Sequence, residues 1–118
     1  MFASHNRLNN LVAIVDRNYI CATDFIENLM TIEPLEDKWR SFGWETVRID
    51  GHSFEQLIEA LGSVRSRRSS KPLCIIADTV KGEGIECLSD NPLWHGIAPK
   101  GKDADAAKAC LLRRYENE

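Results

Sequence analysis

The sequence predicts an α/β domain in which a parallel sheet carries helices on both faces, a three-layer arrangement. Two apolar runs carry this prediction, LVAIVD at residues 11–16 and LCIIA at residues 73–77. Near-continuous Val/Ile/Leu runs are typical of parallel strands that are covered on both faces. Helical patterns separate the predicted strands, and right-handed crossovers make such strands parallel. Ligands of these sheets gather beyond the carboxyl ends of the strands, so polar residues there are candidate functional residues.

The composition favours an ordinary globular domain. The chain has 118 residues, of which 43% are apolar and 28% charged, and its formal net charge is -3. This charge gives no sign of a nucleic-acid or membrane surface, and no apolar run approaches the roughly 18 residues of a membrane span. The cysteines form no Cys-x-x-Cys pair and no zinc-ligand cluster, which favours free thiols in a reducing compartment. We therefore expect a cytoplasmic protein without nucleic-acid or membrane partners.

Local patterns define the elements of the first half. Residues 1–8 are expected to be the last turn and a half of a helix that leads into the first strand. Residues 17–33 lack clean periodicity and are expected to form a long loop, a length that is usually functional or disordered. Pro34 fits a first helical position, and apolar residues at helical spacing continue to Gly43, which ends the helix. Residues 44–49 partly alternate, as a strand with one less buried face does.

A capped helix is predicted after a turn at residues 50–52. Ser53 and Gln56 form a capping box, in which the two side chains each satisfy a free amide of the other residue. The helix is expected to run from residue 54 to about residue 67. Its predicted apolar face consists of Phe54, Leu57, Ile58, Leu61 and Val64.

Two long loops follow the buried strands. The strand at residues 73–77 leads into a loop over residues 80–102, after which an Ala-rich helix is expected over residues 103–114. Because parallel strands end at the same edge of a sheet, we expect Asn18 and the segment 81–95 to approach one crevice.

Candidate functional residues in these loops each have an ordinary alternative. Asn18 offers a neutral oxygen to a hard cation such as magnesium, whose coordination is completed by phosphates and water. Alternatively, Asn18 belongs to a plain turn, because Asp and Asn favour turns. The two glycines of residues 81–84 let backbone approach a phosphate, or form an ordinary turn. His95 is either a titratable donor near a phosphate or sugar hydroxyl, or a packed surface histidine.

Several ordered blocks of the sequence resemble the transketolase family. They are NLVAIVDRN at 10–18, PLEDKWRSFGW at 34–44, DGH at 50–52, TVKGEG at 79–84 and NPLWHGIAP at 91–99. The blocks span nearly the whole chain and are similar to the diphosphate-binding domain of thiamine-diphosphate enzymes, above all to the short N-terminal subunit of split transketolases. The resemblance implies that residues 1–118 form a partial thiamine-diphosphate-binding fold.

The resemblance also implies roles for individual residues. Asn18 would bind a magnesium or calcium ion through its side-chain oxygen, and Ile20 would bind the same ion through its backbone carbonyl. Val80 would line the pocket for the thiazolium and diphosphate groups. His95, the one catalytic candidate, would contact the diphosphate and the reacting sugar. The implied activity is the transfer of a two-carbon ketol unit from a ketose phosphate to an aldose, in which thiamine diphosphate carries the hard chemistry.

The resemblance further implies that the chain acts with other protein segments. The family's Gly-Asp-Gly metal-binding element lies further upstream of Asn18 than this chain reaches, so we interpret Met1 as an internal methionine of a longer protein. The family's pyrimidine-binding domain is also outside the sequence. We therefore expect the chain to be inactive alone and to need a C-terminal transketolase subunit or domain, with a sugar phosphate as substrate. Uncovered apolar strands would favour a homo-oligomer or poor solubility of the isolated chain.

Other interpretations stay open at this point. The alternative that is not an enzyme is a non-catalytic truncated remnant, or a fragment that binds a partner. Among thiamine-diphosphate enzymes, deoxyxylulose-phosphate synthase and the first component of pyruvate dehydrogenase are alternatives, although the Trp-His-Gly sequence at 94–96 favours transketolase. A plain three-layer signalling domain would explain the strands and helices but not the ordered blocks.

Overall fold

The computed structural model describes residues 1–116, and the chain divides into two compact units. The first unit comprises Met1–Arg17 and Ile32–Thr79. The second comprises Asn18–Thr31 and the chain from Val80 onward. Each unit thus combines two separate stretches of sequence, and the chain passes between the units directly after the first and third strands.

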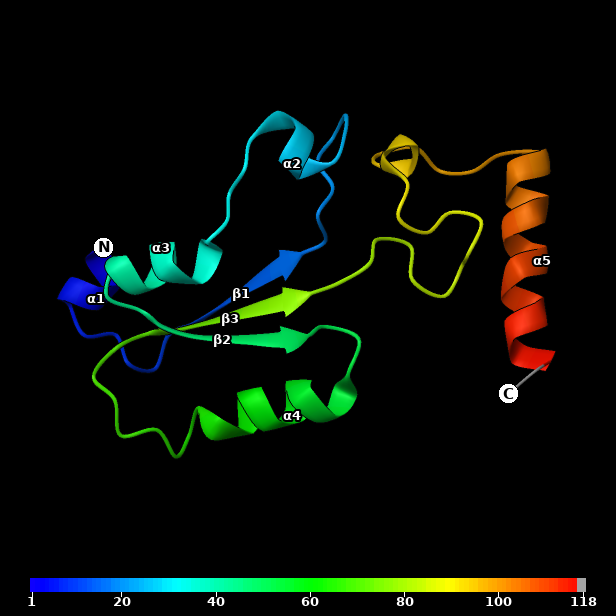
Figure 1. The fold of residues 1–118 in the computed structure, drawn as a ribbon. Coiled ribbons are helices and arrows are strands. Elements are labelled where there is room, and N and C mark those ends of the chain that lie inside the picture. The colour runs from blue at the N-terminus through cyan, green and yellow to red at the C-terminus, as the bar shows by residue number, and fades with distance from the viewer. Residues whose placement is uncertain (117–118) are drawn as a thin grey trace. The chain divides into compact units, whose positions relative to one another are not determined.

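A three-stranded parallel sheet forms the centre of the first unit (Figure 1). Its strands, in the spatial order β1-β3-β2, are β1 (Val12–Arg17), β2 (Glu45–Asp50) and β3 (Leu73–Asp78). Arg17 and Asp50 both pair in register with Asp78, so the three strands end at the same level. The three predicted strands and their parallel direction are therefore confirmed, with ends that differ by one residue.

Helices cover both faces of this sheet (Figure 1). They are α1 (Phe2–His5), α3 (Leu35–Ser41) and α4 (Phe54–Ser63). In Figure 1, α1 and α3 lie on one face and α4 lies on the other, which confirms the predicted three-layer arrangement.

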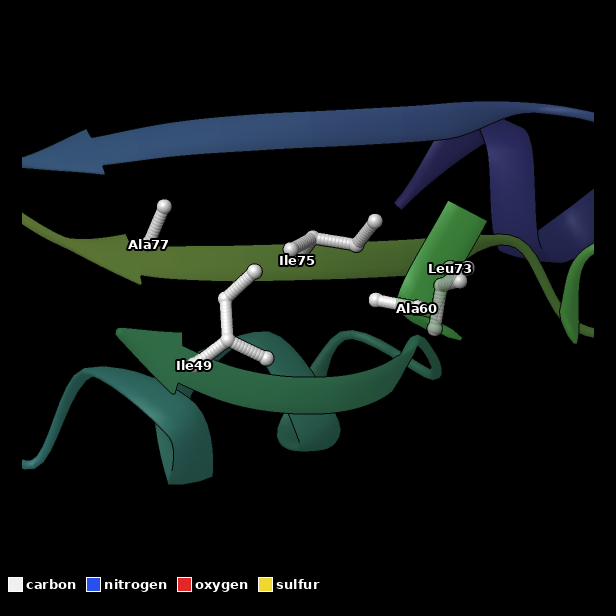
Figure 2. Close-up of a cluster of buried hydrophobic side chains, with 5 residues drawn as sticks. All are labelled: Ile49, Ala60, Leu73, Ile75 and Ala77. Atoms are coloured by element: carbon white, nitrogen blue, oxygen red, sulfur yellow. The ribbon is translucent and has the colours of Figure 1, made fainter. Parts of the chain in front are cut away.

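Each face of the sheet has its own apolar core, because successive residues of a strand point to opposite faces. The core on the α4 side, drawn in Figure 2, consists of Ile49, Ala60, Leu73, Ile75 and Ala77. The core on the other side consists of Trp44, Cys74 and Ile76, against which Ala3, Leu35 and Trp39 pack. The alternating residues of β3 thus supply both cores, as expected for a central parallel strand.

The strand β1 is less buried than its apolar sequence predicts. Within residues 1–116 it pairs with β3 alone, and Ile14 in its middle is 57% exposed. An edge strand lacks a neighbour on one side, so its apolar side chains are covered from one side only. Ile14 therefore leaves apolar surface exposed on β1.

The apolar face predicted for α4 is only partly correct. Leu57 and Val64 pack against the core on either side of Ala60. Phe54 and Ile58, in contrast, are 81% and 70% exposed. The apolar stripe of this helix is wider than the surface that the sheet covers, and the small side chain of Ala60 takes the position nearest the sheet. The helix also ends at Ser63, before the predicted end at residue 67.

Half of the predicted capping box is present at the start of α4. The Ser53 hydroxyl oxygen accepts a hydrogen bond from the Gln56 N–H at 3.3 Å. The Gln56 side chain, however, accepts from the Asp50 N–H at 2.9 Å instead of from Ser53. The Ser53 N–H is satisfied by the Asp50 carbonyl at 3.2 Å, so the turn itself takes over the role predicted for Gln56.

The start of α3 also differs by one residue from the prediction. The helix begins at Leu35, and Pro34 precedes it as the capping residue. A carboxylate oxygen of Glu33 accepts the free N–H of Leu35 at 2.8 Å. Glu33 therefore satisfies a helix-terminal amide that Pro34, which has no suitable side chain, cannot satisfy.

Gly43 ends α3 with a backbone φ of 84°, a left-handed conformation that disfavours other residues. A Cβ atom at this position would collide with the Ser4 side chain of α1. We therefore expect Gly43→Ala to lower the free energy of unfolding by about 2 kcal/mol, measured by urea unfolding. The control is Gly62→Ala, because a Cβ on Gly62 of α4 meets no atom within 4 Å. Equal losses in both variants would contradict this prediction.

The second unit contains short elements and one long helix. They are α2 (Ile26–Leu29), the 3-10 helix η1 (Pro92–Trp94) and α5 (Lys102–Glu116). The helix α5 confirms the predicted Ala-rich helix and extends it slightly at both ends. The helix α2 lies where the sequence predicts only a loop, since four residues are too few to show a helical period. None of the helices within residues 1–116 has the length and apolar composition needed to cross a membrane.

Candidate cofactor site

Asn18 begins the second unit directly after β1, and its side chain is held in a tight turn. The side-chain oxygen of Asn18 accepts a hydrogen bond from the Ile20 N–H at 3.0 Å. Tyr19 lies between them with a φ of 62°. Asn favours such turns because its short side chain mimics a backbone carbonyl. Asn18 therefore forms a turn, which the sequence analysis gave as the alternative to a cation site. This turn holds the Asn18 oxygen beside Ile20.

The Ile20 carbonyl belongs to the same turn. Ile20 is 4% exposed and faces Phe25 in an isolated antiparallel bridge. The two hydrogen bonds of this bridge, 2.9 and 2.8 Å long, join the residues on either side of the pair. Among the hydrogen bonds of residues 1–116, none ends at the Ile20 carbonyl. This oxygen and that of Asn18 are neutral hard donors, the type that magnesium and calcium accept.

The donor set fits a divalent cation only in combination with other ligands. Within residues 1–116, no group of three or more His, Cys, Asp or Glu side chains is arranged to hold a metal. Magnesium demands octahedral coordination but usually takes few protein ligands, and phosphates and water supply the others. Asn18 and Ile20 therefore provide only two of the oxygen ligands that such a site needs.

Val80 opens the loop that follows β3, and this loop folds as consecutive tight turns. Gly82 and Gly84 have φ values of 77° and 91°, so both occupy left-handed backbone. A Cβ at Gly82 would lie only 3.1 Å from the Leu88 carbonyl oxygen. The glycines are thus required by the path of the chain, which is what both the phosphate-loop and the ordinary-turn interpretations predict. The Val80 side chain is 39% exposed.

His95 follows η1 at the surface of the second unit. The Asn91 side-chain oxygen caps this short helix by accepting the Leu93 N–H at 3.0 Å. The His95 N–H donates to the Pro92 carbonyl at 3.0 Å. The imidazole itself is exposed and makes no hydrogen bond or ion pair within residues 1–116. Its backbone is held in place, and its ring is accessible to a ligand.

The four predicted site residues belong to the same compact unit, but only two of them are joined directly. Asn18 and Ile20 share a hydrogen bond, whereas none within residues 1–116 links either of them to Val80 or His95. A cavity of about 610 Å³ in this unit is lined by other residues, mainly from residues 83–89 and α5. The common crevice for Asn18 and His95 therefore stays a prediction.

A charged network at the carboxyl ends of the strands is a feature that the sequence analysis missed. Arg17 of β1 is 1% exposed, and its Nε atom donates to Glu33 at 3.1 Å. Arg48 of β2 donates twice to Asp78 of β3, at 2.6 and 2.8 Å, and reaches Glu33 at 3.4 Å. Charged residues at the ends of apolar runs were the only signal in the sequence. The network ties all three strand ends together directly before the chain enters the second unit.

This network predicts a pH dependence of stability. The Leu35 N–H and the guanidinium groups of Arg17 and Arg48 hold the pKa of Glu33 below its ordinary value. The charged form is therefore favoured in the folded state, so its contribution is complete above the ordinary carboxyl pKa and is lost as the pH falls through the lowered one. We expect the stability difference between wild type and Glu33→Gln to be large at neutral pH and to shrink in acid, measured by urea unfolding. A difference independent of pH would contradict this assignment.

Comparison with known proteins identifies the family. Residues 1–114 match the family model described as "Transketolase, thiamine diphosphate binding domain". The chain belongs to the transketolase family. The resemblance predicted from the ordered blocks is thereby confirmed, and so is the thiamine-diphosphate-binding type of domain.

Relatives within the transketolase family include bacterial subunits and whole enzymes. An apulose-4-phosphate transketolase subunit of Actinobacillus succinogenes is 32% identical over 105 residues, which cover 89% of this chain and 37% of the relative. The 6-deoxy-6-sulfo-D-fructose transketolase subunit SqwG of Clostridium sp. is 39% identical over 84 residues, covering 71% and 30% respectively. The crystal structure of transketolase from Campylobacter jejuni matches with a TM-score of 0.75 and 26% identity, over 95% of this chain and 20% of that chain. The chain thus spans less than half the length of each of these relatives.

Proposed function

We propose that this chain is the diphosphate-binding portion of a split transketolase, which moves a two-carbon ketol unit between sugar phosphates. The observation that carries the proposal is the turn at residues 18–20, where the Asn18 side-chain oxygen and the unengaged Ile20 carbonyl lie together in a transketolase-family chain. The relatives named as subunits support a partner that is encoded as a separate polypeptide. Residues 1–118 then represent a partial domain of the complete enzyme.

Each site residue has a definite task in this proposal. Thiamine diphosphate, when bound, supplies the carbanion chemistry of the reaction. Asn18 and Ile20 present their oxygens to a magnesium or calcium ion that neutralises the diphosphate. Val80 shields the cofactor ring from water. His95 positions the diphosphate and the sugar by donating a hydrogen bond from its imidazole.

Exposed apolar surface supports the proposed need for a partner. Ile14 on β1 and Phe54 and Ile58 on α4 are each more than half exposed. Large apolar side chains that are this exposed are suited to contact with another protein segment. We therefore propose that a C-terminal transketolase subunit or domain, together with a second copy of the chain, covers these surfaces and completes the site. Without them, no turnover of sugar phosphates is expected.

The test is isothermal titration of thiamine diphosphate and magnesium into the full-length protein, with and without the subunit encoded beside it. We expect binding in the complex, and we expect Asn18→Ala to weaken it at least about tenfold, as loss of a metal-site group does. Asn18→Asp keeps an oxygen that can accept the Ile20 N–H, so this variant should retain binding.

Asn28→Ala is the matched control for this experiment. Asn28 lies in the same unit, and its exposed side chain donates to Asp24 at 3.1 Å. The control should leave the affinity unchanged. Equal affinities of Asn18→Ala and Asn28→Ala would remove Asn18 from the site. No binding in either state would favour the alternative, a non-catalytic remnant that keeps the family's sequence without its activity.

A further inference from the structure

Thr79 directly follows β3 and lies against the ends of the other two strands. The Thr79 hydroxyl donates a hydrogen bond to the Asp16 carboxylate of β1. The Thr79 N–H donates to the Arg17 carbonyl of the same strand at 3.2 Å. Gly51 follows β2, and a Cβ atom there would collide with the Thr79 methyl group. Thr79, which is half-buried, thus brings the ends of all three strands into contact.

The two branches of the Thr79 side chain have different neighbours. The hydroxyl faces Asp16, which pairs with Ala77 in the register of the sheet. Ala77 and Thr79 are two positions apart, so their side chains point to the same side of the sheet. The methyl group lies against Gly51 instead. A serine would keep only the hydroxyl and a valine would keep only the methyl contact, so substitutions separate the two contacts.

The contacts of Thr79 lie where the chain leaves the first unit. Asn18 comes two residues after Asp16, and Val80 directly follows Thr79. Asn18 and Val80 begin the two stretches of sequence that form the second unit. The hydrogen bonds of Thr79 therefore set the distance between the two points at which these stretches begin.

A backbone amide in each of these stretches reports on this arrangement. The Ile20 N–H donates to the Asn18 side-chain oxygen at 3.0 Å. The Glu83 N–H donates to the Val80 carbonyl at 3.1 Å. Each hydrogen bond closes a turn shortly after the contact between Asp16 and Thr79. Hydrogen exchange at the two amides therefore detects a change in either turn without any cofactor present.

We propose that Thr79 is a positioning residue of the cofactor site, which holds the turn at Asn18 and the loop at Val80 at the spacing that the cofactor needs. This inference rests on the proposed function, in which Asn18, Ile20 and Val80 hold the cofactor and its metal ion. Thr79 acts through Asp16, because the strand that contains Asp16 leads directly to Asn18. Groups that orient the ligands of a metal ion influence its affinity without touching it.

The test compares Thr79→Val with Thr79→Ser in the full-length protein together with the subunit encoded beside it. Thr79→Val should weaken the binding of magnesium and thiamine diphosphate by about tenfold, measured by isothermal titration. It should also speed hydrogen exchange at residues 20 and 83 by about fivefold without cofactor, as loss of one hydrogen bond does. Thr79→Ser keeps the donor and Asp16→Asn keeps an acceptor oxygen, so both should behave like the wild type.

Ser66→Ala is the matched control for the loss of a hydroxyl group. Ser66 belongs to the same unit as Thr79, and its exposed hydroxyl donates to the Ser63 carbonyl at 3.0 Å. This control should change neither the affinity nor the exchange at residues 20 and 83. Exchange at residues 74–76 in the middle of β3 should stay unchanged in Thr79→Val, which separates a local effect from a general loss of stability.

Three results would overturn the positioning role of Thr79. They are a Thr79→Val variant that behaves like Ser66→Ala, one that speeds exchange throughout the sheet, and a Thr79→Ser variant that loses as much affinity as Thr79→Val. A wild-type complex that binds no cofactor would contradict the proposed function instead. The exchange at residues 20 and 83 would then decide the role of Thr79 alone.

Discussion

Glu33→Ala is expected to lower the free energy of unfolding by about 3 kcal/mol, because it takes a charged partner from the Arg17 side chain, which is 1% exposed, although Glu33 itself is 32% exposed. Glu33 accepts hydrogen bonds from Arg17, which is 1% exposed, and from the Leu35 N–H at the start of α3. The substitution removes a charged partner of the buried Arg17 guanidinium. It also removes the acceptor of the Leu35 N–H at the start of α3. Urea unfolding followed by tryptophan fluorescence measures this loss, because Trp39 and Trp44 pack edge to face in the first unit, with ring centroids 4.9 Å apart.

Glu36→Ala is the control for this change. Glu36 forms an ion pair with Arg40 one helical turn away, but the Arg40 side chain is 51% exposed. Exposed pairs of this kind contribute only about 0.5 kcal/mol. If the two glutamate variants lose similar stability, the charged network at the strand ends does not stabilise the fold as argued.

Ile75→Ala is expected to cost about 4 kcal/mol, because a fully buried side chain leaves a cavity when it is shortened. Ile75 has no exposed surface and lies in the middle of β3, in the core on the α4 side (Figure 2). The same urea experiment measures this change.

Ile14→Ala provides a matched control on the neighbouring strand. Ile14 of β1 pairs directly with Ile75 in the register of the sheet but is 57% exposed. We expect its replacement to cost less than about 1 kcal/mol, since an exposed side chain buries little apolar surface. A larger loss in Ile14→Ala than in Ile75→Ala would mean that β1 is covered in solution by further protein, as in an oligomer.

The sheet was predictable because its strands are signalled by short stretches of sequence. The runs at residues 11–16 and 73–77 need no knowledge of the rest of the chain, and the intervening helices imply parallel strands. The burial of β1 was not predictable in the same way. The sequence of an apolar strand is the same whether the residues that cover it belong to this stretch of chain or to another protein segment.

The place of Asn18 in the fold could be predicted, but the side-chain contacts around the strand ends could not. The sequence placed Asn18 immediately after a strand, and the structure confirms that position. The network of Arg17, Glu33, Arg48 and Asp78 was missed, because its members come from separate elements and meet only after the sheet has formed. Side-chain choices within one turn were equally hard to predict, as Gln56 shows by bonding to Asp50 instead of Ser53.

The order of the strands in the sheet determines when each strand can pair while the chain is being synthesised. β1 and β2 both pair with β3 and not with each other, yet β3 is the last of the three to leave the ribosome. Both strands therefore stay unpaired until residues 73–78 have been synthesised, and pairing between distant segments is slow. Waiting strands of this kind are prone to aggregation. We expect the newly made chain to depend on molecular chaperones during this interval more than a protein of similar size with hairpin-paired strands.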